Sequence, residues 1–461
     1  MLHVGGNYGQ NQNHGAFYLN GNNAASNQNA NIGCRPLAGW HTSLLRFKPF
    51  PRFDIDGWNG RAALAGDMPE GHGLVHAGRR DGNTVRQQGE KTPMKRAGNL
   101  FPQLISDGNL DLAIDEVNRT HRWHPHHKPN RVVKWVEETR EERRAELRQM
   151  ILGGFTPSPS TPKRRWDKSA GKWRDIYEPR LWPDQYIHHA LVQVLQPAMM
   201  RGMDPWCCGS IRGRGIHYGM RGIKKWLRND PKGTRWCAEL DIHHFYESLQ
   251  PAVVMERMRR LVKDRRVLDL IERVTQGGIQ IGAYYSQWLA NTTLQPLDHA
   301  LRESGLKVTH YIRYMDNITL YARSKRALDK AIRLVQGWLE EHGMRLKGNW
   351  QKFRTADRLP CALGYRYGRG YNLLRKRNLF RLARQLRRYY RKIRRGQRIP
   401  ITLATGLLSR LGQLRHCNST RIYKRLVKPK TQRALKCVVR QYMKKERSKW
   451  NMSTGPRTAA A

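Results

Sequence analysis

Two stretches decide the fold: residues 237–249 read CAELDIHHFYESL, and residues 311–321 read YIRYMDNITLY. The apolar run of the first stretch leads into Asp241, which the pattern places on a strand. The second stretch predicts a pair of strands joined by a turn that contains Asp316. Carboxylates at neighbouring strand ends offer the oxygen ligands that Mg²⁺ prefers. The two stretches therefore predict a magnesium site at one edge of a sheet.

Helical periodicity recurs on both sides of these strands. The spacing of apolar residues predicts helices over 101–119, 132–152, 183–200, 251–275 and 324–342, and strands over 235–246 and 309–323. Gly282 is expected to open a further helix, whose first turn carries Ser286 and Gln287. Helices and strands in this order predict an α+β fold.

The charge of the chain points to a polyanion. Its 461 residues include 85 Lys and Arg against 36 Asp and Glu, a formal net charge of +49. Nucleic acid is the most direct partner for such an excess, although composition leaves non-specific binding open. Residues 371–450 carry 26 Lys and Arg and one acid, Glu446, and they predict basic helices broken at Gly396–Pro400 and Pro429.

Neither membrane insertion nor secretion is expected. No run of about 18 apolar residues occurs, which predicts the absence of a membrane-spanning helix. The seven cysteines are scattered without a CxxC pair, which fits a reducing, cytoplasmic environment.

Taken together, these motifs resemble those of bacterial reverse transcriptases, over roughly residues 95–450. The resemblance implies an α+β right-hand polymerase with fingers, a palm built on an antiparallel sheet backed by helices, and a helical thumb. It implies N-terminal helices and fingers over 94–234, the palm over 235–370, a basic helical thumb over 371–450 and a tail over 451–461.

The resemblance also implies a role for each acidic motif. CAELDIHHFYESL resembles the first palm motif, so Asp241 and the carbonyl of Ile242 would contact metal, and Tyr246 would exclude a 2′-hydroxyl. YMDN resembles the YxDD motif, so Asp316 would be the second carboxylate ligand, with Asn317 in support. The cofactor would be two Mg²⁺ ions, with Mn²⁺ as a substitute.

Other motifs that resemble the family surround the substrate. GKWRDIYEP and CCGSIRGRGIHYG resemble two fingers blocks whose basic residues would neutralise the triphosphate or template, namely Lys172, Arg174, Arg212 and Arg214. Asp184, His188 and His189 accompany the first of these blocks. The primer grip would comprise Leu363, Gly364 and Tyr365.

The sequence departs from the common pattern at the base-pair-facing motif. Group II intron and retron enzymes read Gln-Gly…Ser-Pro, whereas this chain reads Ile281-Gly282…Ser286-Gln287. That change resembles the reverse transcriptases of diversity-generating retroelements, which copy template adenines with errors. An isoleucine cannot hydrogen-bond a nucleotide as glutamine can, so base pairing would be checked less strictly.

A second departure bears on activity, because Asn317 stands where YxDD has its second aspartate. The amide keeps an oxygen but removes one negative charge, so activity is expected to survive with altered metal preference. The expected function is RNA-directed DNA synthesis with an RNA template, a primer strand and dNTPs, and with a basic accessory protein as a further candidate partner. An antiphage-defence reverse transcriptase and a polymerase-inactive, maturase-like RNA-binding protein remain as alternatives.

The first 93 residues form an Asn- and Gly-rich leader, and residues 1–34 contain nine Asn and no charged side chain. The leader is expected to be disordered. Residues 1 to about 37 resemble the diversified segment of retroelement target proteins, which suggests a template repeat translated in frame. A genuine Asn-rich tail is the alternative.

For two further groups of residues, a role in binding is the less favoured interpretation. His121, His124, His126 and His127 fit a solvated loop better than a zinc site. Core packing is favoured over base stacking for each tryptophan of the fingers region, namely Trp135, Trp166, Trp173, Trp182 and Trp206.

Overall fold

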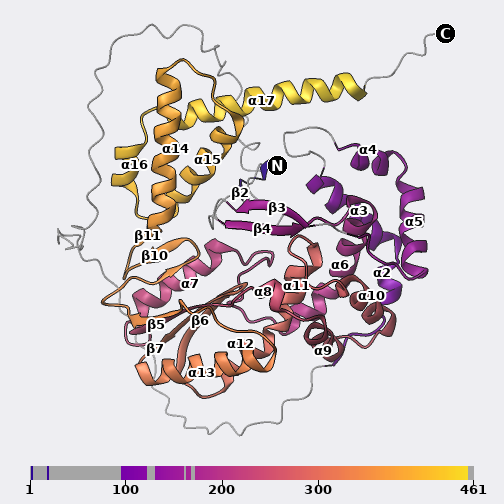
Figure 1. Ribbon diagram of the computed structural model, residues 1–461, viewed down its shortest axis with the longest axis horizontal. Helices are drawn as coiled ribbons and strands as arrows, with labels where there is room; N and C mark the ends of the chain where they lie inside the picture. Colours follow the sequence, from indigo (N-terminus) through magenta and orange to yellow (C-terminus); the bar gives the residue numbers. More distant parts are fainter. Residues whose placement is uncertain are drawn as a thin grey trace, which may run out of the picture. The chain divides into compact units, whose positions relative to one another are not determined.

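The computed structural model describes residues 2–3, 18–19, 95–121, 130–159, 162–167 and 172–454 (Figure 1). The expectations for most of the leader, for His124, His126 and His127, and for the tail after residue 454 lie outside this part of the chain. Helices and antiparallel sheets are mixed in it, which confirms the predicted α+β class. None of the described helices is long and apolar enough to cross a membrane.

A four-stranded antiparallel sheet occupies the centre of the described region. Its strands, in spatial order, are β6 (Val308–Tyr314), β7 (Asn317–Ala322), β5 (Trp236–Asp241) and β8 (Gln351–Arg354). The predicted strand pair is confirmed. The first predicted strand is shorter than expected and ends at Asp241, because His244 adopts a left-handed φ of 46° and starts the short helix α8 (Phe245–Ser248).

The sheet separates two hydrophobic cores. On one face, Ala238 and Leu240 of β5 belong to the core that includes α13 (Lys325–Glu341). On the other face, Cys237 belongs to the core that includes α7 (Ile216–Asn229) (Figure 1). Successive side chains of a strand point to opposite faces, so Asp241 shares the α7 face with Cys237.

Two predicted long helices are each split into two. The helix expected over 132–152 consists of α4 (Arg131–Glu138) and α5 (Arg140–Leu152), because Thr139 leaves the helical conformation and caps α4 through Trp135. The separate direction of α5 allows its arginines to pair with aspartates of α3 (Asp107–His121). The ion pairs are Arg140–Asp111, Arg144–Asp107 and Arg148–Asp107.

The helix expected over 251–275 likewise consists of α9 (Pro251–Leu261) and α10 (Arg265–Thr275). The backbone of Ala97 inserts at this break, where it bonds to the backbones of Leu261 and Lys263. Asp264 then accepts hydrogen bonds from the N–H groups of Leu100 and Phe101, at 3.1 and 2.8 Å. The break therefore anchors the start of the N-terminal helices, α2 (Phe101–Leu104) and α3.

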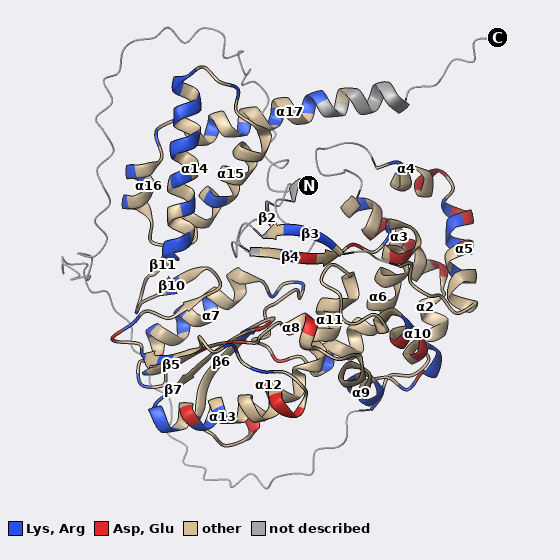
Figure 2. Cartoon of the chain, viewed as in Figure 1, with Lys and Arg blue, Asp and Glu red and all other residues tan. Residues whose placement is uncertain are grey.

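The basic C-terminal segment is helical, as predicted. Its helices are α14 (Lys376–Arg394), α15 (Ile401–Leu414), α16 (Thr420–Leu426) and α17 (Thr431–Thr454). Both predicted breaks occur, and a third lies between α15 and α16. Lys and Arg residues recur along α14 (Figure 2), while Leu382, Leu386 and Tyr389 are buried.

Helix α6 supplies much of the N-terminal part of the first hydrophobic core. Helix α6 (Tyr186–Arg201) follows a single π-helical turn, η1 (Leu181–Gln185), and packs against α3 and α11 (Tyr284–Thr293). His188 of α6 is 2% exposed, and its ring lies edge-on to Tyr285 of α11. Neither ring nitrogen of His188 has a hydrogen-bond partner among the described residues. Burial, with a smaller contribution from His189, lowers the pKa of His188 to about 3.

We expect the substitution His188→Phe to flatten the acid side of the stability profile. Between pH 6.5 and 3 the unfolded chain binds a proton that the folded His188 excludes, so unfolding becomes easier by about 1.4 kcal/mol per pH unit. At pH 7.5 both states are neutral there, and the variant should be at least as stable because it buries no unpaired nitrogen. Chemical denaturation at pH 7.5 and 5.5 measures the difference. Equal pH slopes in the two proteins would contradict it.

Candidate active site

Asp241 and Asp316 meet at one edge of the central sheet. Asp241 is the last residue of β5 and pairs in register with Asn317, the first residue of β7. The N–H of Ile242 donates to the carbonyl oxygen of Asp316 at 3.1 Å. The N–H and carbonyl of one strand residue face the same side, so the Ile242 carbonyl is directed toward the turn that carries Asp316.

The turn that carries Asp316 is tight. Tyr314 and Asn317 are paired, so Met315 and Asp316 form a two-residue connection, and Met315 has a φ of 56°. The Asn317 amide donates to Asp316 Oδ1 at 2.9 Å. Gly209 packs behind the turn, where a Cβ would lie 2.8 Å from the Met315 nitrogen. A larger residue at 209 would therefore displace the turn.

The negative charge of Asp241 affects the ionisation of Asp316. Burial, and then the negative charge of Asp241, raises the pKa of Asp316 to about 6. The ammonium group of Lys347 forms an ion pair with Asp241 and partly offsets this effect on Asp316. A positive charge placed near both carboxylates would favour the ionised form of Asp316.

The donor set at this edge fits Mg²⁺. It consists of two carboxylates, the Ile242 carbonyl and the Asn317 amide, and all four supply the oxygen atoms that Mg²⁺ prefers. No group of three or more His, Cys, Asp or Glu side chains suited to a metal occurs among the described residues. A magnesium site here would therefore complete its ligands with backbone oxygens, water or substrate phosphates.

Tyr246 lies near Asp316, and Arg174 lies near Tyr246. Burial, followed by the charge of Asp316, raises the pKa of the Tyr246 phenol, while Arg174 acts in the opposite direction. Arg174 belongs to β4 (Lys172–Tyr177), which pairs with β3 (Pro162–Asp167) as an antiparallel hairpin. The side chain of Lys172 lies outside what the structure describes.

The hairpin also contacts the Ile281–Gly282 segment. The N–H of Tyr177 donates to the Ile281 carbonyl at 2.9 Å. Gly282 has a φ of 128°, and the Tyr177 carbonyl occupies the space that a Cβ would need, so glycine is required there for backbone packing. Helix α11 begins two residues later than expected, at Tyr284.

Ser286 and Gln287 occupy the first turn of α11, as predicted. Ser286 is 1% exposed, and its hydroxyl donates to the Gln280 carbonyl at 2.7 Å. This bond closes the turn before α11, which is a structural task. Gln287 is half-buried.

Leu363, Gly364 and Tyr365 form a hairpin on the α7 side of the sheet. Leu363 and Gly364, with φ of 54° and 85°, are the two turn residues between β9 (Cys361–Ala362) and β10 (Tyr365–Tyr367). Strand β10 also pairs with β11 (Asn372–Leu374). The Cys361 N–H donates to Glu239 of β5, two residues before Asp241, so the hairpin is anchored near the carboxylates.

The two arginines of the second predicted fingers block differ. Arg214 donates to the Asp204 carbonyl at 2.9 Å and holds its own loop together. Arg212 is exposed. No contact described here places Arg212 or Arg214 against the carboxylate pair.

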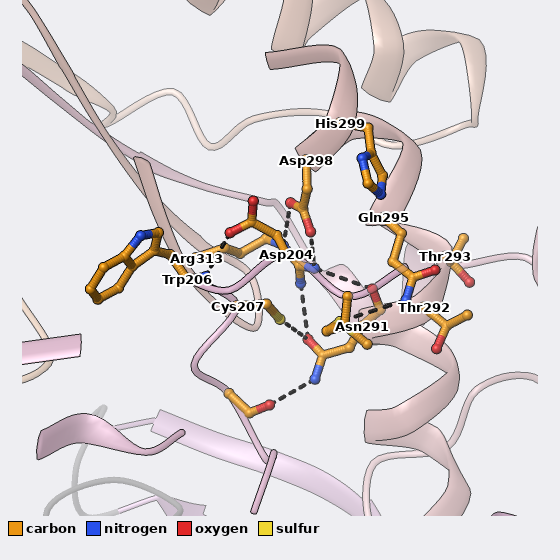
Figure 3. Close-up of polar contacts among 12 residues, drawn as sticks. Asp204, Trp206, Cys207, Asn291, Thr292, Thr293, Gln295, Asp298, His299 and Arg313 are labelled. Carbon is orange, nitrogen blue, oxygen red and sulfur yellow. Dashed lines mark hydrogen bonds and ion pairs between the residues drawn. The ribbon is translucent and has the colours of Figure 1, made fainter. Parts of the chain in front are cut away.

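A buried ion pair supports the turn from the opposite face (Figure 3). Arg313 of β6 and Asp298 of α12 (Gln295–Glu303) are both fully buried, with 2.6 Å between Nη2 and Oδ2. Arg313 also donates to Asn291 Oδ1 at 2.9 Å, and Asn291 donates to the Gly209 carbonyl at 2.8 Å. Burial would lower the pKa of Arg313, but Asp298 outweighs it and holds the pKa well above its usual value.

Sequence reasoning did not identify Asn291, Asp298, Arg313 or Lys347. One signal was available for Arg313, because an arginine that shares a strand face with Tyr311 and stands in an otherwise apolar stretch requires a buried acid. The partner could not be deduced, since Asp298 lies on another element. Nothing in the spacing around Lys347 indicates its pairing with Asp241.

Comparison with known proteins bears directly on this region. Residues 162–366 match the family described as reverse transcriptase (RNA-dependent DNA polymerase). The matched stretch is similar in sequence to a reverse transcriptase domain and spans less than half of the chain. The stretch includes the β3–β4 hairpin, both aspartates, the Ile281–Gln287 motif and the Leu363–Tyr365 turn.

Individual relatives are distant. Protein YkfC of Escherichia coli (strain K12) is 22% identical over 278 residues, which cover 50% of this chain and 71% of YkfC. Nuclear intron maturase 1, mitochondrial, of Arabidopsis thaliana is 31% identical over 106 residues, which cover 23% of this chain but 14% of the maturase. A structure of apo telomerase from Candida tropicalis, truncated from the C-terminal domain, aligns with a TM-score of 0.33 and 12% identity over 48% of this chain and 53% of that chain.

We expect Asp298→Asn to destabilise the protein by about 3–5 kcal/mol, because it leaves the Arg313 charge buried without a counter-ion. The double variant Asp298→Leu/Arg313→Met, which buries no charge, should lose less than the single variant. Denaturation midpoints in urea measure both effects. Glu256→Gln, which removes the exposed Arg260–Glu256 pair, is the matched control and should change stability by less than about 0.5 kcal/mol. A single variant as stable as this control would contradict the expectation.

Proposed function

We propose that this chain is an RNA-directed DNA polymerase that copies RNA into cDNA and does so with errors, as part of a diversity-generating retroelement. The observation that carries the polymerase assignment is the Asp241–Asp316 pair at adjacent strand ends, inside the region that matches the reverse transcriptase family. The fingers, palm and thumb are proposed for residues 94–234, 235–370 and 371–450. The four-stranded sheet between two helical layers supports that division.

Asp241 and Asp316 would hold the metal ions, with the Ile242 carbonyl and the Asn317 amide as additional oxygen donors. When bound, two Mg²⁺ ions supply the charge that stabilises the attacking 3′-hydroxyl and the departing pyrophosphate. Lys347 holds Asp241 in place and limits the negative charge of the pair. Asn317 holds Asp316 in place by donating an amide hydrogen bond to its carboxylate.

Arg174 and Tyr246 would position the incoming nucleotide. Arg174 lies close enough to Tyr246 to influence its phenol, which brings a cation next to the carboxylate edge where a triphosphate would lie. Lys172 is two residues away on the same strand and would add to this charge. Tyr246 is half-buried and would occupy the space of a 2′-hydroxyl, which selects deoxynucleotides.

Ile281, Gly282, Ser286 and Gln287 would line the base-pair side of this site. The Ile281 carbonyl accepts a hydrogen bond from the N–H of Tyr177, and any residue at this position could make the same bond. The difference between isoleucine and glutamine therefore lies in the side chain. An aliphatic side chain cannot report a mispaired base through a hydrogen bond, which supports the error-prone assignment.

The duplex of template and primer would contact the basic C-terminal helices. The cationic side of α14 suits a phosphate backbone, because neutralising phosphates releases counter-ions. The Leu363–Gly364–Tyr365 turn would support the primer end, and Arg212, which is exposed, would meet the template or triphosphate. A basic accessory protein stays a candidate partner from the resemblance alone.

A second candidate is an RNA-binding protein that has lost polymerase activity, as a maturase-like scaffold could. Asn317 favours it, because one carboxylate of the YxDD pattern is absent. The cationic surface serves both functions equally, so RNA binding alone does not separate them.

Primer extension by the full chain on an RNA template with Mg²⁺ and dNTPs tests the proposal. We expect extension by the wild type and no detectable product from Asp241→Asn or Asp316→Asn, because each variant removes one of two carboxylates. Both variants should keep RNA affinity. Absence of extension by the wild type, also with Mn²⁺, together with tight RNA binding, would favour the scaffold.

We expect Ile281→Gln to reduce misincorporation opposite template adenines by about 2- to 10-fold, the value of one hydrogen bond of about 0.5–1.5 kcal/mol. Sequencing of cDNA from the two proteins on one template measures it. Error rates opposite the other three bases are the internal control. An unchanged error spectrum would remove Ile281 as the cause of infidelity.

We expect Asn317→Asp to lower the Mg²⁺ concentration needed for half-maximal extension, since it restores a carboxylate at the strand end. Titration of Mg²⁺ and Mn²⁺ against initial rate measures the change. A variant that needs more Mg²⁺ than the wild type would show that the amide hydrogen bond to Asp316 matters more than the added charge.

A further inference from the structure

The β3–β4 hairpin exposes two tryptophans that core packing was expected to bury. Trp166 is 48% exposed and Trp173 is 54% exposed. The two residues are directly opposite in register, and their rings meet edge to face with centroids 5.4 Å apart. By contrast, Trp206 is half-buried and packs against Trp226. Two large aromatic side chains exposed together at the same position indicate a binding surface.

The register of the hairpin separates its two faces. Trp166, Trp173 and Arg164 share one face, because paired residues and residues two apart on a strand point the same way. Arg174 and Ile176 occupy the other face. Ile176 lies against Gly282 and Arg174 lies near Tyr246, so this second face is turned toward the carboxylate site. The tryptophan face is therefore the outward one.

The outward face also carries one cation, Arg164, and one carboxylate, Asp175, which are paired in register. The Arg164 guanidinium lies 5.8 Å from the Trp173 ring centroid, in a cation–π arrangement. On the other face, Lys163 and Arg165 form ion pairs with Glu178. An aromatic pair next to a guanidinium offers a stacking surface for a base together with a contact for its phosphate.

We infer that the Trp166–Trp173 face binds the unpaired template strand just ahead of the copying site by stacking on its bases. A duplex hides the faces of its bases, so this surface selects a single strand. The net charge of +49 favours a polyanion over a basic protein partner. The assignment to the template rests on the proposed polymerase function, whereas the stacking itself does not.

Equilibrium binding of the full chain to two labelled RNA–DNA duplexes tests the inference. One duplex is blunt, and the other carries a 5′ single-stranded RNA overhang of about ten nucleotides. The variant Trp166→Leu/Trp173→Leu keeps apolar bulk but removes the stacking faces, and Trp166→Phe/Trp173→Phe keeps them. We expect the Leu variant to lose about 5- to 150-fold in affinity for the overhang, the equivalent of about 1–3 kcal/mol for a stacked base.

Affinity for the blunt duplex should stay unchanged in both variants, and the Phe variant should bind the overhang nearly as the wild type does. Trp135→Leu is the matched control, because Trp135 is 38% exposed and lies on α4, outside the hairpin. Unchanged overhang binding by the Leu variant would overturn the inference and leave the surface to a protein partner. An equal loss for the blunt duplex would also overturn it.

Binding is measured without dNTPs, so the result does not depend on catalysis. Suppose that the wild type extends no primer, and that the Leu variant binds the overhang more weakly than the wild type does. This result would refute the polymerase proposal and support the stacking surface. If the wild type extends a primer but the Leu variant binds the overhang equally well, the polymerase proposal is supported and the stacking surface is refuted.

Discussion

The buried ion pair between Arg313 and Asp298 determines the geometry of the carboxylate edge. Burying a guanidinium away from water costs several kcal/mol of free energy unless hydrogen-bond acceptors surround it. The residues that accept from Arg313 are therefore held in fixed positions. Asp298 fixes α12 and Asn291 fixes α11, and Asn291 in turn holds the backbone of Gly209. Gly209 packs against Met315, which precedes Asp316 in the turn. The position of the second aspartate therefore depends on a charge buried on the opposite face of the sheet.

Helix α11 extends this dependence to the rest of the site. It spans ten residues, or roughly 15 Å at 1.5 Å per residue. Before its first turn, Ile281 bonds to the β3–β4 hairpin, and near its last turn Asn291 bonds to Arg313. Arg174, Ile281 and Asp316 thus belong to elements that one short helix ties together, although they are far apart in the sequence. This arrangement is what a substrate in contact with all three requires.

The periodicity of apolar residues predicted the strands and helices whose limits depend on nearby residues. The strand pair around Asp316 and the helix after Ser324 follow from periodicity, and the structure adds that the Ser324 hydroxyl caps α13 by accepting from the N–H of Ala327. The break at Thr139 was missed because the ion pairs of α5 with α3 join residues far apart in sequence. The exposure of Trp166 and Trp173 was missed because residue type alone favours burial of tryptophan. The closeness of Asp241 and Asp316 was predictable, since both stand at strand ends. The ion pairs of Lys347 and Asp298 were not predictable, because their partners lie on other elements and no regular spacing in the sequence connects them.

The charge balance at the carboxylate edge supports the proposed cation site. Lys347 supplies one positive charge against two carboxylates, so the group keeps a net negative charge when both are ionised. Burial and Asp241 raise the pKa of Asp316 to about 6, which shows that ionising it has a free-energy cost in the folded chain. Stability alone would favour an amide at one of the two positions. The amide stands instead at Asn317, where its hydrogen bond supports the ionised form of Asp316 and leaves the negative charge available to a divalent ion.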